Sequence, residues 1–321
     1  MVRCEECLRA NPPTRVNCLY CAAILPTNET TIHLQKPSLR PLEKWEQGYN
    51  NILWPPPANV SEPGLSEAAA LLRLATADLA RILAHEMPLP VARAATLEEA
   101  LLVQRRLAKI RIGTRIVPDA ELGAAETAIT KVRAIEIDDT GIGAFQTPET
   151  PAIHIGWSDF ELLVAGRLIT RRFELKEQNR VRSEDSIVNA SEFFTDEPVF
   201  ELHTKTLSSP YRFSANSFDF SCLGKMKSLL AGANITTLLN QFSENAPHAE
   251  RNESYNLVRK ALEAVWPSQQ QHESIGWRRE LPGKYIVGSA TETSNESQFS
   301  RYSRLRYFLH AEAKAKNDED A

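Results

Sequence analysis

Four of the five cysteines are concentrated near the amino end of the chain. They follow the pattern Cys4-x2-Cys7-x10-Cys18-x2-Cys21 and occupy one run of 18 positions, whereas Cys222 is remote from them. A Cys-x2-Cys pair can fold as a knuckle that points both thiolates at one ion. Two knuckles then supply the four sulfur ligands that a tetrahedral zinc ion prefers. The spacing therefore predicts one metal site made of these four cysteines.

The predicted site is structural, and zinc is its expected occupant. Four protein thiolates fill every coordination position of a tetrahedral ion, so no water remains for the ion to activate. A rubredoxin-like iron site uses the same ligands and is the alternative occupant. Two disulfides are the other use of the cysteines, but a reducing cytosol disfavours them. The segment has few apolar residues, so metal binding is expected to supply most of its folding free energy.

The cysteine pattern resembles the zinc-ribbon family, whose members carry two such knuckles on short hairpins. The resemblance covers Cys4 to about Pro26 and implies a zinc ribbon over residues 1–26. It does not select a function, because zinc ribbons occur in nucleic-acid machinery, in protein-interaction modules and as N-terminal appendages. Three arginines of the segment could contact phosphates, but Glu5 and Glu6 offset two of them. A solvated polar surface is therefore expected here.

Side chains that could act in catalysis are few and scattered. Asp138 and Asp139 could serve as acids, bases or metal ligands, but Asp-Asp-Thr-Gly is explained fully by turn chemistry. His154 and His203 alternate with apolar neighbours in predicted strands, and a lone thiol in an apolar run, such as Cys222, is usually part of a core. The sequence therefore predicts that the protein is not an enzyme. A hydrolase or transferase whose site is assembled from distant residues is an alternative.

Residues 27–64 are predicted to be a proline-rich linker between the ribbon and the rest of the chain. Prolines remove backbone donors and hold a chain extended. Within the linker, the segment 42–54 carries Trp45, Tyr49 and Trp54, and clusters of aromatic residues are seldom exposed on monomers. We expect this segment to pack against the protein's own body, with docking to a partner as the alternative.

Residues 65–125 are predicted to form a small α/β module. Ser66 and Thr96 are the expected N-caps of its two helices, and strands joined by a helix are expected to pair in parallel. The elements are expected over residues 66–85 (helix), 89–94 (strand), 97–110 (helix) and 114–117 (strand). This part resembles the ferredoxin-like modules of bacterial regulatory proteins, on Thr96-Leu-Glu-Glu-Ala100 and Ile116-Val-Pro-Asp119. A basic cluster near the second helix is expected to be ordinary surface: Arg105, Arg106, Lys109, Arg111 and Arg115.

Residues 130–250 are predicted to be a β domain closed by one helix. Asp138-Asp-Thr-Gly141 is a hairpin signal between two short strands. Further elements are expected over 152–156, 157–163, 168–175, 199–204 and 211–214 (strands), 176–198 (a long polar loop) and 233–245 (helix). The order resembles the pleckstrin-homology-like fold, on Ile155-Gly-Trp157-Ser-Asp-Phe160, Val164-Ala-Gly-Arg-Leu168 and the helix near Asn234. The resemblance implies a platform that binds ligands or partners. The plug of the barrel is expected to consist of Leu238, Leu239 and Phe242.

Residues 251–310 are predicted to be a C-terminal helical extension, and residues 311–321 a disordered tail. A short helix is expected over 255–266. The segment Phe299–Phe308 interleaves arginines with aromatic residues. This pattern could bind single-stranded nucleic acid by stacking and charge, or it could place the aromatic side of a helix on the body. Packing is favoured, because the whole chain is acidic.

Composition and charge indicate an ordinary folded protein. Hydrophobic residues make up 42% of the chain and charged residues 24%, which is typical of soluble domains. A net charge of -4 gives no global attraction to nucleic acid or to anionic membranes. The amino end lacks the basic and apolar regions of a secretory signal, and no run approaches the roughly 20 apolar residues of a membrane span. A cytoplasmic location and no membrane partner are expected.

The sequence thus predicts an α+β multidomain protein with a zinc ribbon, a small ferredoxin-like α/β module and a pleckstrin-homology-like β-barrel capped by a helix. The expected function is that of a non-enzymatic, zinc-binding regulatory or protein-interaction protein, and the expected partner is a protein. A nucleic-acid-associated zinc-ribbon factor is the alternative, and it would bind nucleic acid with a steep dependence on salt.

Overall fold

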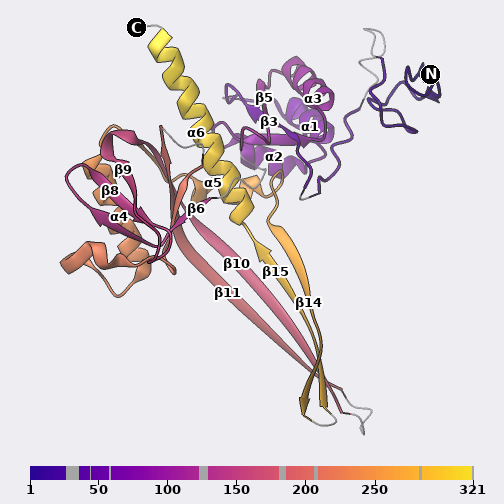
Figure 1. Ribbon diagram of the computed structural model, residues 1–321. Helices are drawn as coiled ribbons and strands as arrows, with labels where there is room; N and C mark the ends of the chain where they lie inside the picture. The colour runs from indigo at the N-terminus through magenta and orange to yellow at the C-terminus, as the bar shows by residue number, and fades with distance from the viewer. Residues whose placement is uncertain are drawn as a thin grey trace. The chain divides into compact units, whose positions relative to one another are not determined.

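The computed structural model describes residues 1–26, 36–43, 45–57, 59–122, 129–180, 186–205, 209–281 and 284–319 (Figure 1). The chain divides into two compact units. Unit 1 comprises Met1–Ala125 together with Lys260–Trp266, and unit 2 comprises Glu126–Arg259 together with Pro267–Ala321. Both units combine helices with sheets, so the chain is an α+β protein.

Unit 1 begins with a small segment built from two turns. Strands β1 (Val2–Arg3) and β2 (Ala10–Asn11) pair in antiparallel orientation, and an isolated antiparallel bridge joins Asn17 to Ile24. Each pairing closes a loop that contains one Cys-x2-Cys pair. The two pairs of cysteines are therefore carried on two separate short hairpins.

The α/β part of unit 1 has a three-stranded sheet with β3 (Tyr49–Leu53) at its centre. β3 is antiparallel to β4 (Pro90–Ala94) on one side and to β5 (Thr114–Pro118) on the other. The expected direct pairing of β4 with β5 is therefore wrong, because β3 lies between them. β3 itself falls inside the range 27–64 that was predicted to be a linker. A five-residue strand with prolines close by and two adjacent asparagines gave no periodic signal.

The first predicted helix of unit 1 differs from the structure in its length and in its N-cap, which is not the expected Ser66. In place of a single helix over 66–85, the chain forms α1 (Glu62–Leu72) and α2 (Thr76–Leu83). The N-cap of α1 is Ser61, whose hydroxyl accepts a hydrogen bond from Gly64 N at 3.3 Å. The expected cap at Thr96 is confirmed, since its Oγ1 accepts from Glu99 N at 3.3 Å at the start of α3 (Leu97–Lys109).

A buried polar network fixes β3 within unit 1. Asp119 is fully buried and accepts hydrogen bonds from Gly48 N at 2.8 Å, Asn50 Nδ2 at 2.9 Å and Arg93 Nε at 2.8 Å. Trp266 Nε1 donates to Asn50 Oδ1 at 2.8 Å. These partners lie far apart in the sequence, and each buried polar group of the network gains a partner, as a folded interior requires.

The aromatic residues around β3 have different environments. Tyr49 is half-buried in the strand, whereas the side chain of Trp45 is 80% exposed and that of Trp54 is 40% exposed. The strand thus packs within its own unit, as expected. Trp45 does not.

Unit 2 is built on one seven-stranded sheet. Its order is β14-β15-β10-β11-β12-β6, and β13 pairs in parallel with the inner end of β10. Part of this sheet curls into a half-barrel. The bounds are β6 (Thr130–Val132), β10 (Phe160–Arg180), β11 (Ser186–Thr204), β12 (Tyr211–Ser214), β13 (Glu250–Asn252), β14 (Gln269–Leu281) and β15 (Lys284–Ser294). A second, antiparallel sheet contains β7 (Ala134–Ile137), β8 (Gly141–Phe145) and β9 (Ile153–Gly156).

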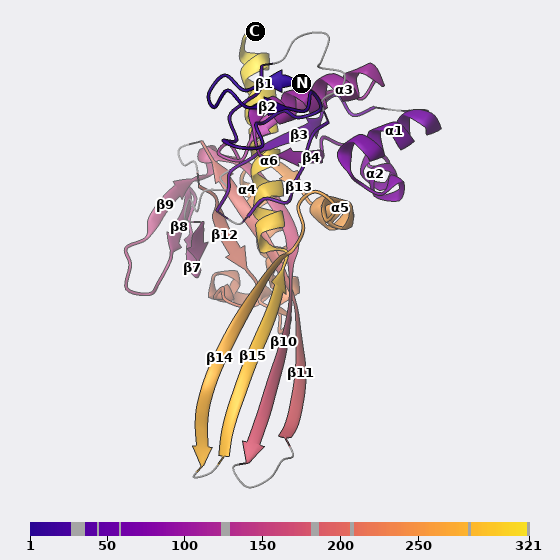
Figure 2. The ribbon, with the colours of Figure 1, turned by 90° about the vertical axis from the view of Figure 1, so that its right-hand side faces the viewer.

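The outer parts of four strands form a long arm. β10 pairs with β11 on one side and, from Thr170 to Arg180, with β15 on the other, while β14 pairs with β15. Eleven residues of pairing correspond to a length of about 35 Å. Figure 2 shows these strands side by side with no helix across them. The prediction of a loop is wrong for residues 176–180 and 186–198, which belong to β10 and β11, while residues 181–185 lie outside the described part of the chain. The prediction of a helical extension over 251–310 holds for helices at 255–262 and from 296 onward, but not for the segment between them, which contains β14 and β15.

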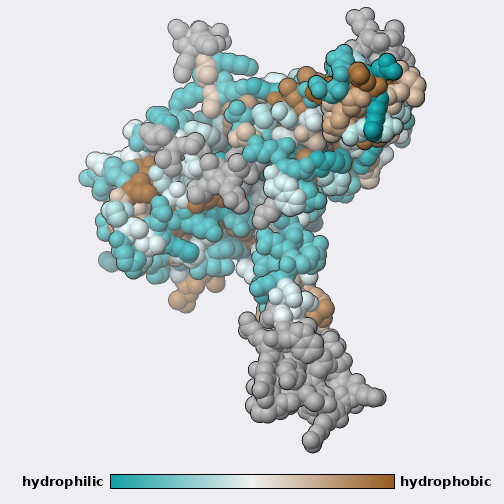
Figure 3. Space-filling view, turned by 45° about the vertical axis from the view of Figure 1, so that its right-hand side comes forward, coloured by the Kyte–Doolittle hydropathy of each residue, from teal (hydrophilic) through white to brown (hydrophobic). Residues whose placement is uncertain are grey.

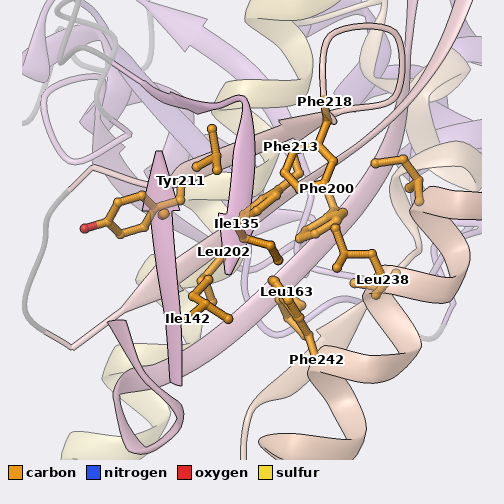
Figure 4. Packing of buried hydrophobic residues seen from close by; sticks show 14 of the residues in the cluster. Ile135, Ile142, Leu163, Phe200, Leu202, Tyr211, Phe213, Phe218, Leu238 and Phe242 are labelled. Carbon is orange, nitrogen blue, oxygen red and sulfur yellow. The ribbon is translucent and has the colours of Figure 1, made fainter. Parts of the chain in front are cut away.

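One face of the unit 2 sheet carries the main hydrophobic core (Figure 4). The helix α4 (Ala231–Asn245) packs there through Leu238, Leu239 and Phe242, as expected for the plug. The Phe242 ring has the rings of Phe160, Phe200, Phe213 and Trp157 around it at centroid distances of 5.4 to 5.9 Å. Short 3-10 helices lie at Trp157–Asp159 and Phe220–Met226.

The other face of the sheet packs against α6 (Glu296–Glu319). The ring of Tyr255, at the start of α5 (Tyr255–Leu262), lies 5.0 Å from the ring of Phe299 in α6. Phe299 and Tyr302 of α6 are fully buried, which confirms that the aromatic residues of the arginine-rich segment pack on the body. The predicted disordered tail is wrong as far as Glu319, because α6 continues to that residue. Among the described residues, every helix is too short or too polar to cross a lipid bilayer.

Candidate metal centre

The first cysteine pair lies in a tight turn whose backbone curls around the thiol groups. Leu8 N donates to Cys4 O at 3.0 Å, and Cys4 N donates to Arg9 O at 3.0 Å. Leu8 has a φ of 58°, in the left-handed region that favours glycine. The turn therefore holds Cys4 and Cys7 on one side of a closed loop.

The second cysteine pair repeats this turn fourteen positions later. Ala22 N donates to Cys18 O at 3.1 Å, and Cys18 N donates to Ala23 O at 2.7 Å. Ala22 has a φ of 60°, which matches the φ of Leu8 in the first turn. Both bonds join the same relative positions as in the first turn. The segment therefore contains two equivalent knuckles, and each presents two thiols.

The four sulfur atoms converge on one point. All four Sγ atoms lie within 4.8 Å of one another, with separations of 3.6 Å from Cys4 to Cys21 and 3.5 Å from Cys7 to Cys18. A tetrahedral ion with Zn–S distances of about 2.3 Å places its sulfur atoms about 3.8 Å apart. A disulfide needs about 2.05 Å. The arrangement fits four thiolate ligands of one metal ion, and it joins the four residues that the spacing predicts.

Asn11 supports the centre from behind, a role that the sequence analysis does not predict. Its side chain is fully buried, and Nδ2 lies 3.4 Å from Cys18 Sγ and 3.0 Å from Arg9 O. Its Oδ1 accepts a hydrogen bond from Leu19 N at 2.9 Å. The amide thus connects both knuckles and donates to a sulfur ligand, as the residues behind metal ligands commonly do. A single amide between two cysteine pairs is too common a feature to predict this role.

The electrostatics of the thiols differ within the cluster. Burial opposes ionisation of Cys18, but hydrogen bonds from the backbone of Tyr20 and Cys21 and from Asn11 outweigh it and lower the pKa of the Cys18 thiol to about 6. Tyr20 N is 3.4 Å from this sulfur. A thiolate is the form that binds a metal ion. The site therefore favours the ionised form of Cys18 at neutral pH. At Cys21, a backbone hydrogen bond from Ala23 is outweighed by burial and by the thiols of Cys7, Cys4 and Cys18, which together raise the pKa of the Cys21 thiol to about 12.

The hydrophobic core of this segment is very small. Its buried members are Cys4, Cys18 and Leu25, and two of these three are themselves candidate ligands. So small a core cannot offset the conformational entropy of about 25 ordered residues. A bound ion is the interaction that could supply the missing free energy.

Within the described part of the chain, the other side chains that could act in catalysis, Asp138, His154 and Cys222, form no hydrogen bond with one another. Asp138 Oδ1 accepts hydrogen bonds from Thr140 Oγ1 at 2.6 Å, Thr140 N at 2.7 Å and Gly141 N at 3.0 Å, so it forms the predicted turn, and these bonds lower the pKa of Asp138. His154 is exposed on β9, and burial raises the pKa of the Cys222 thiol to about 11. Among the described residues, the four cysteines are the only group of three or more His, Cys, Asp or Glu side chains that could share an ion.

No protein-family model matches the sequence, and no curated protein or solved structure is similar to it.

Proposed function

We propose that this chain is a non-enzymatic binding protein whose first 26 residues form a zinc ribbon. The observation that carries the proposal is the convergence of four cysteine sulfur atoms, all within 4.8 Å of one another, on two equivalent knuckles. Four thiolates close the coordination sphere, which supports a structural ion and not a catalytic one. Zinc is the commonest occupant of such sites, and iron remains the alternative.

Exposed aromatic side chains on the arm of unit 2 support a protein as the partner. Phe173 is 43% exposed, Phe193 is 53% exposed and Phe194 is 59% exposed. Figure 3 shows hydrophobic atoms beside hydrophilic ones at the start of the arm. Aromatic residues that are exposed in a free protein and surrounded by polar ones are typical of interaction sites.

The environment of the arginine-rich segment argues against the nucleic-acid alternative. Arg304 is 7% exposed, and Arg306 forms an ion pair with Glu250 at 3.5 Å. Arginines that are buried or paired in α6 are less able to neutralise phosphates than solvated ones. Filter binding of a single-stranded oligonucleotide at two salt concentrations tests this alternative, which requires binding that falls steeply with salt.

The zinc proposal is tested by elemental analysis of the purified full chain. We expect one zinc ion per chain, and Cys4→Ser or Cys21→Ser should reduce the zinc content to well below one half. Cys222→Ser is the matched control, because it removes a thiol outside the cluster and should leave the zinc content unchanged. Iron in place of zinc, or full zinc content in the Cys4→Ser and Cys21→Ser variants, would contradict the proposal.

A chelator provides the second measurement. Because the segment has a core of only three buried residues, removal of zinc should increase hydrogen exchange throughout residues 1–25. Exchange in β10 and β11 of unit 2 should stay unchanged. Equal protection of the first 25 residues with and without the chelator would show that the metal does not hold this segment together.

A further inference from the structure

Unit 1 contains a cleft of about 450 Å³ whose lining is strongly basic. Lys36, Arg73, Arg106 and Lys109 line it, against a single carboxylate, that of Glu67. The whole chain has more acidic than basic residues, with 41 of the former and 37 of the latter. The cleft, with four basic side chains and one acidic side chain, is therefore much more basic than the chain as a whole.

The basic residues come from three separate parts of unit 1. Lys36 lies in the segment before β3, and its backbone N–H donates to Thr14 O at 3.0 Å. Arg73 is the residue that ends α1, and Lys109 is the last residue of α3. Positive side chains at the ends of helices also complement the helix dipoles. Interaction with a helix dipole explains Arg73 and Lys109 individually. It does not explain the position of Lys36, or why all these basic side chains line the same cleft.

Arg73 occupies a backbone conformation that disfavours it. Its φ is 57° and its ψ is 33°, the left-handed conformation in which glycine is the usual residue at the end of a helix. A side chain with a Cβ is strained in that region, and such strain is often found where a side chain has a function. The sequence thus places a guanidinium at the cleft where glycine would suit the backbone better.

The rest of the lining is apolar. Leu71 of α1 and Ile110 after α3 are both half-buried, and Pro37 is buried. A volume of about 450 Å³ lies in the range of sites that hold small molecules. Among the described residues, no carboxylate forms an ion pair with Lys36, Arg73 or Lys109. An anion bound between these cations would therefore reduce their mutual repulsion.

We infer that this cleft binds a nucleoside phosphate, with the phosphate groups between the cations and the ring on the apolar residues. Arginine and lysine are the side chains that bind phosphate, through charge-assisted hydrogen bonds. An apolar wall of Leu71 and Ile110 gives a flat ring a surface to cover. The Glu67 carboxylate is the acceptor for a ribose hydroxyl or a ring amine. This ligand class goes beyond the proposed function, and the cleft uses none of the four cysteines.

The test is isothermal titration of the zinc-loaded full chain with ATP, pyrophosphate and adenosine at low and at physiological salt. We expect saturable binding of ATP, weaker binding of pyrophosphate and none of adenosine. Lys109→Gln should weaken ATP binding about tenfold or more, as expected for the loss of a charge-assisted contact. Arg105→Gln is the matched control. It removes the same charge from α3, but Arg105 does not line the cleft, and its Nε donates to Leu101 O.

Arg73→Gly separates binding from folding. Glycine suits a φ of 57°, so this variant should keep or raise the thermal midpoint of unit 1 while it weakens ATP binding about tenfold or more. Zinc content measured in each preparation shows whether the ribbon is intact. A loss of zinc therefore bears on the proposed function, and a loss of ATP binding in zinc-loaded protein bears on the cleft.

Three results would overturn the inference. The first is the absence of saturable ATP binding at low salt. The second is an equal loss of affinity in Arg105→Gln and Lys109→Gln, which would indicate diffuse surface attraction. The third is equal affinity for pyrophosphate and ATP, which would show that the nucleoside is not recognised. Displacement of ATP by a single-stranded oligonucleotide that binds more tightly would also contradict a small nucleoside ligand.

Discussion

A neutral histidine buried between the sheet of unit 2 and α6 makes the stability of that unit sensitive to acid. His203 is 1% exposed, its Nε2 lies 2.8 Å from Ser303 Oγ, and its ring stacks on Tyr307 with centroids 4.7 Å apart. Burial lowers the pKa of His203 from 6.5 to about 3, and the charges of Arg304 and His310 act in the same direction. The folded protein therefore keeps this ring neutral through the mildly acidic range.

The size of the effect follows from the two protonation states. The unfolded chain binds a proton at His203 below pH 6.5, whereas the folded chain does not until pH falls to about 3. Stability is thus fully present above pH 6.5 and is lost as pH falls toward 3. Each pH unit below 6.5 lowers the free energy of unfolding by about 1.4 kcal/mol. At pH 5, about 1.5 units lower, the free energy of unfolding is therefore reduced by about 2 kcal/mol.

The measurement compares wild type with His203→Gln in urea at pH 7.5 and at pH 5. Far-UV circular dichroism follows the strands of unit 2, and glutamine keeps a hydrogen-bonding group near Ser303 but does not titrate. The variant should lose about 2 kcal/mol less than wild type between the two pH values. His272→Gln, at an exposed histidine of β14, is the control and should follow wild type. The same loss in wild type and His203→Gln would refute the reasoning.

Two further substitutions test the packing of α6 on the sheet. Gly166→Ala would place a Cβ 2.6 Å from Cε2 of the buried Phe299 ring, and we expect a loss of about 1 to 3 kcal/mol in the free energy of unfolding, measured in urea. Arg212→Ala would leave the fully buried Glu201 carboxylate without its partner, which lies 2.5 Å away. We expect a loss of about 3 to 5 kcal/mol in the same measurement.

Each of these two predictions has a matched control. At Gly143 a new Cβ would meet the Ala152 Cβ at 3.4 Å, an ordinary contact, so Gly143→Ala should change stability little. Arg167 forms a partly exposed ion pair with Asp196, and Arg167→Ala should cost no more than about 1 kcal/mol. If either control lost as much stability as its counterpart, burial would not be the cause of the larger effect.

The parts of the structure that were predictable depend on local patterns. The cysteine spacing predicted which thiols meet, because two x2 knuckles need no information from elsewhere in the chain. The turn at Asp138 and the cap at Thr96 were predicted for the same reason, since each is made by residues within three positions. The apolar face of α4 is likewise a periodic signal within one helix.

The arm was missed because its sequence is mostly polar. Residues 189–196 of β11 are all exposed, and a strand without a buried face shows no alternation of polar and apolar residues. In addition, the strand β15 that pairs with β10 lies about 100 positions away from it in the sequence. The last turns of α6 were missed for a related reason, because polar composition predicts disorder unless a helix is tied down at its start. Here α6 is held by Phe299 and Tyr302.

The alternation in β11 shows why burial could not be inferred from one strand alone. Phe200 and Leu202 belong to the main core, and Glu201 and His203, which alternate with them, predict a solvated face. That face is buried as well, because α6 lies on it and brings polar groups that match. Arg212 of β12 joins Glu201 to Glu296 of α6.

Such a buried polar interface demands a specific register. A shift of α6 by one residue would move Ser303 away from His203 and leave buried polar groups without partners, at about 1 to 3 kcal/mol each. Apolar contacts would tolerate the same shift more easily, because they are not directional. Buried ion pairs contribute little net free energy to folding. The polar contacts therefore determine the position of α6 on the sheet more than they add to the stability of unit 2. Complementarity of this kind belongs to pairs of segments, so neither segment predicts it alone.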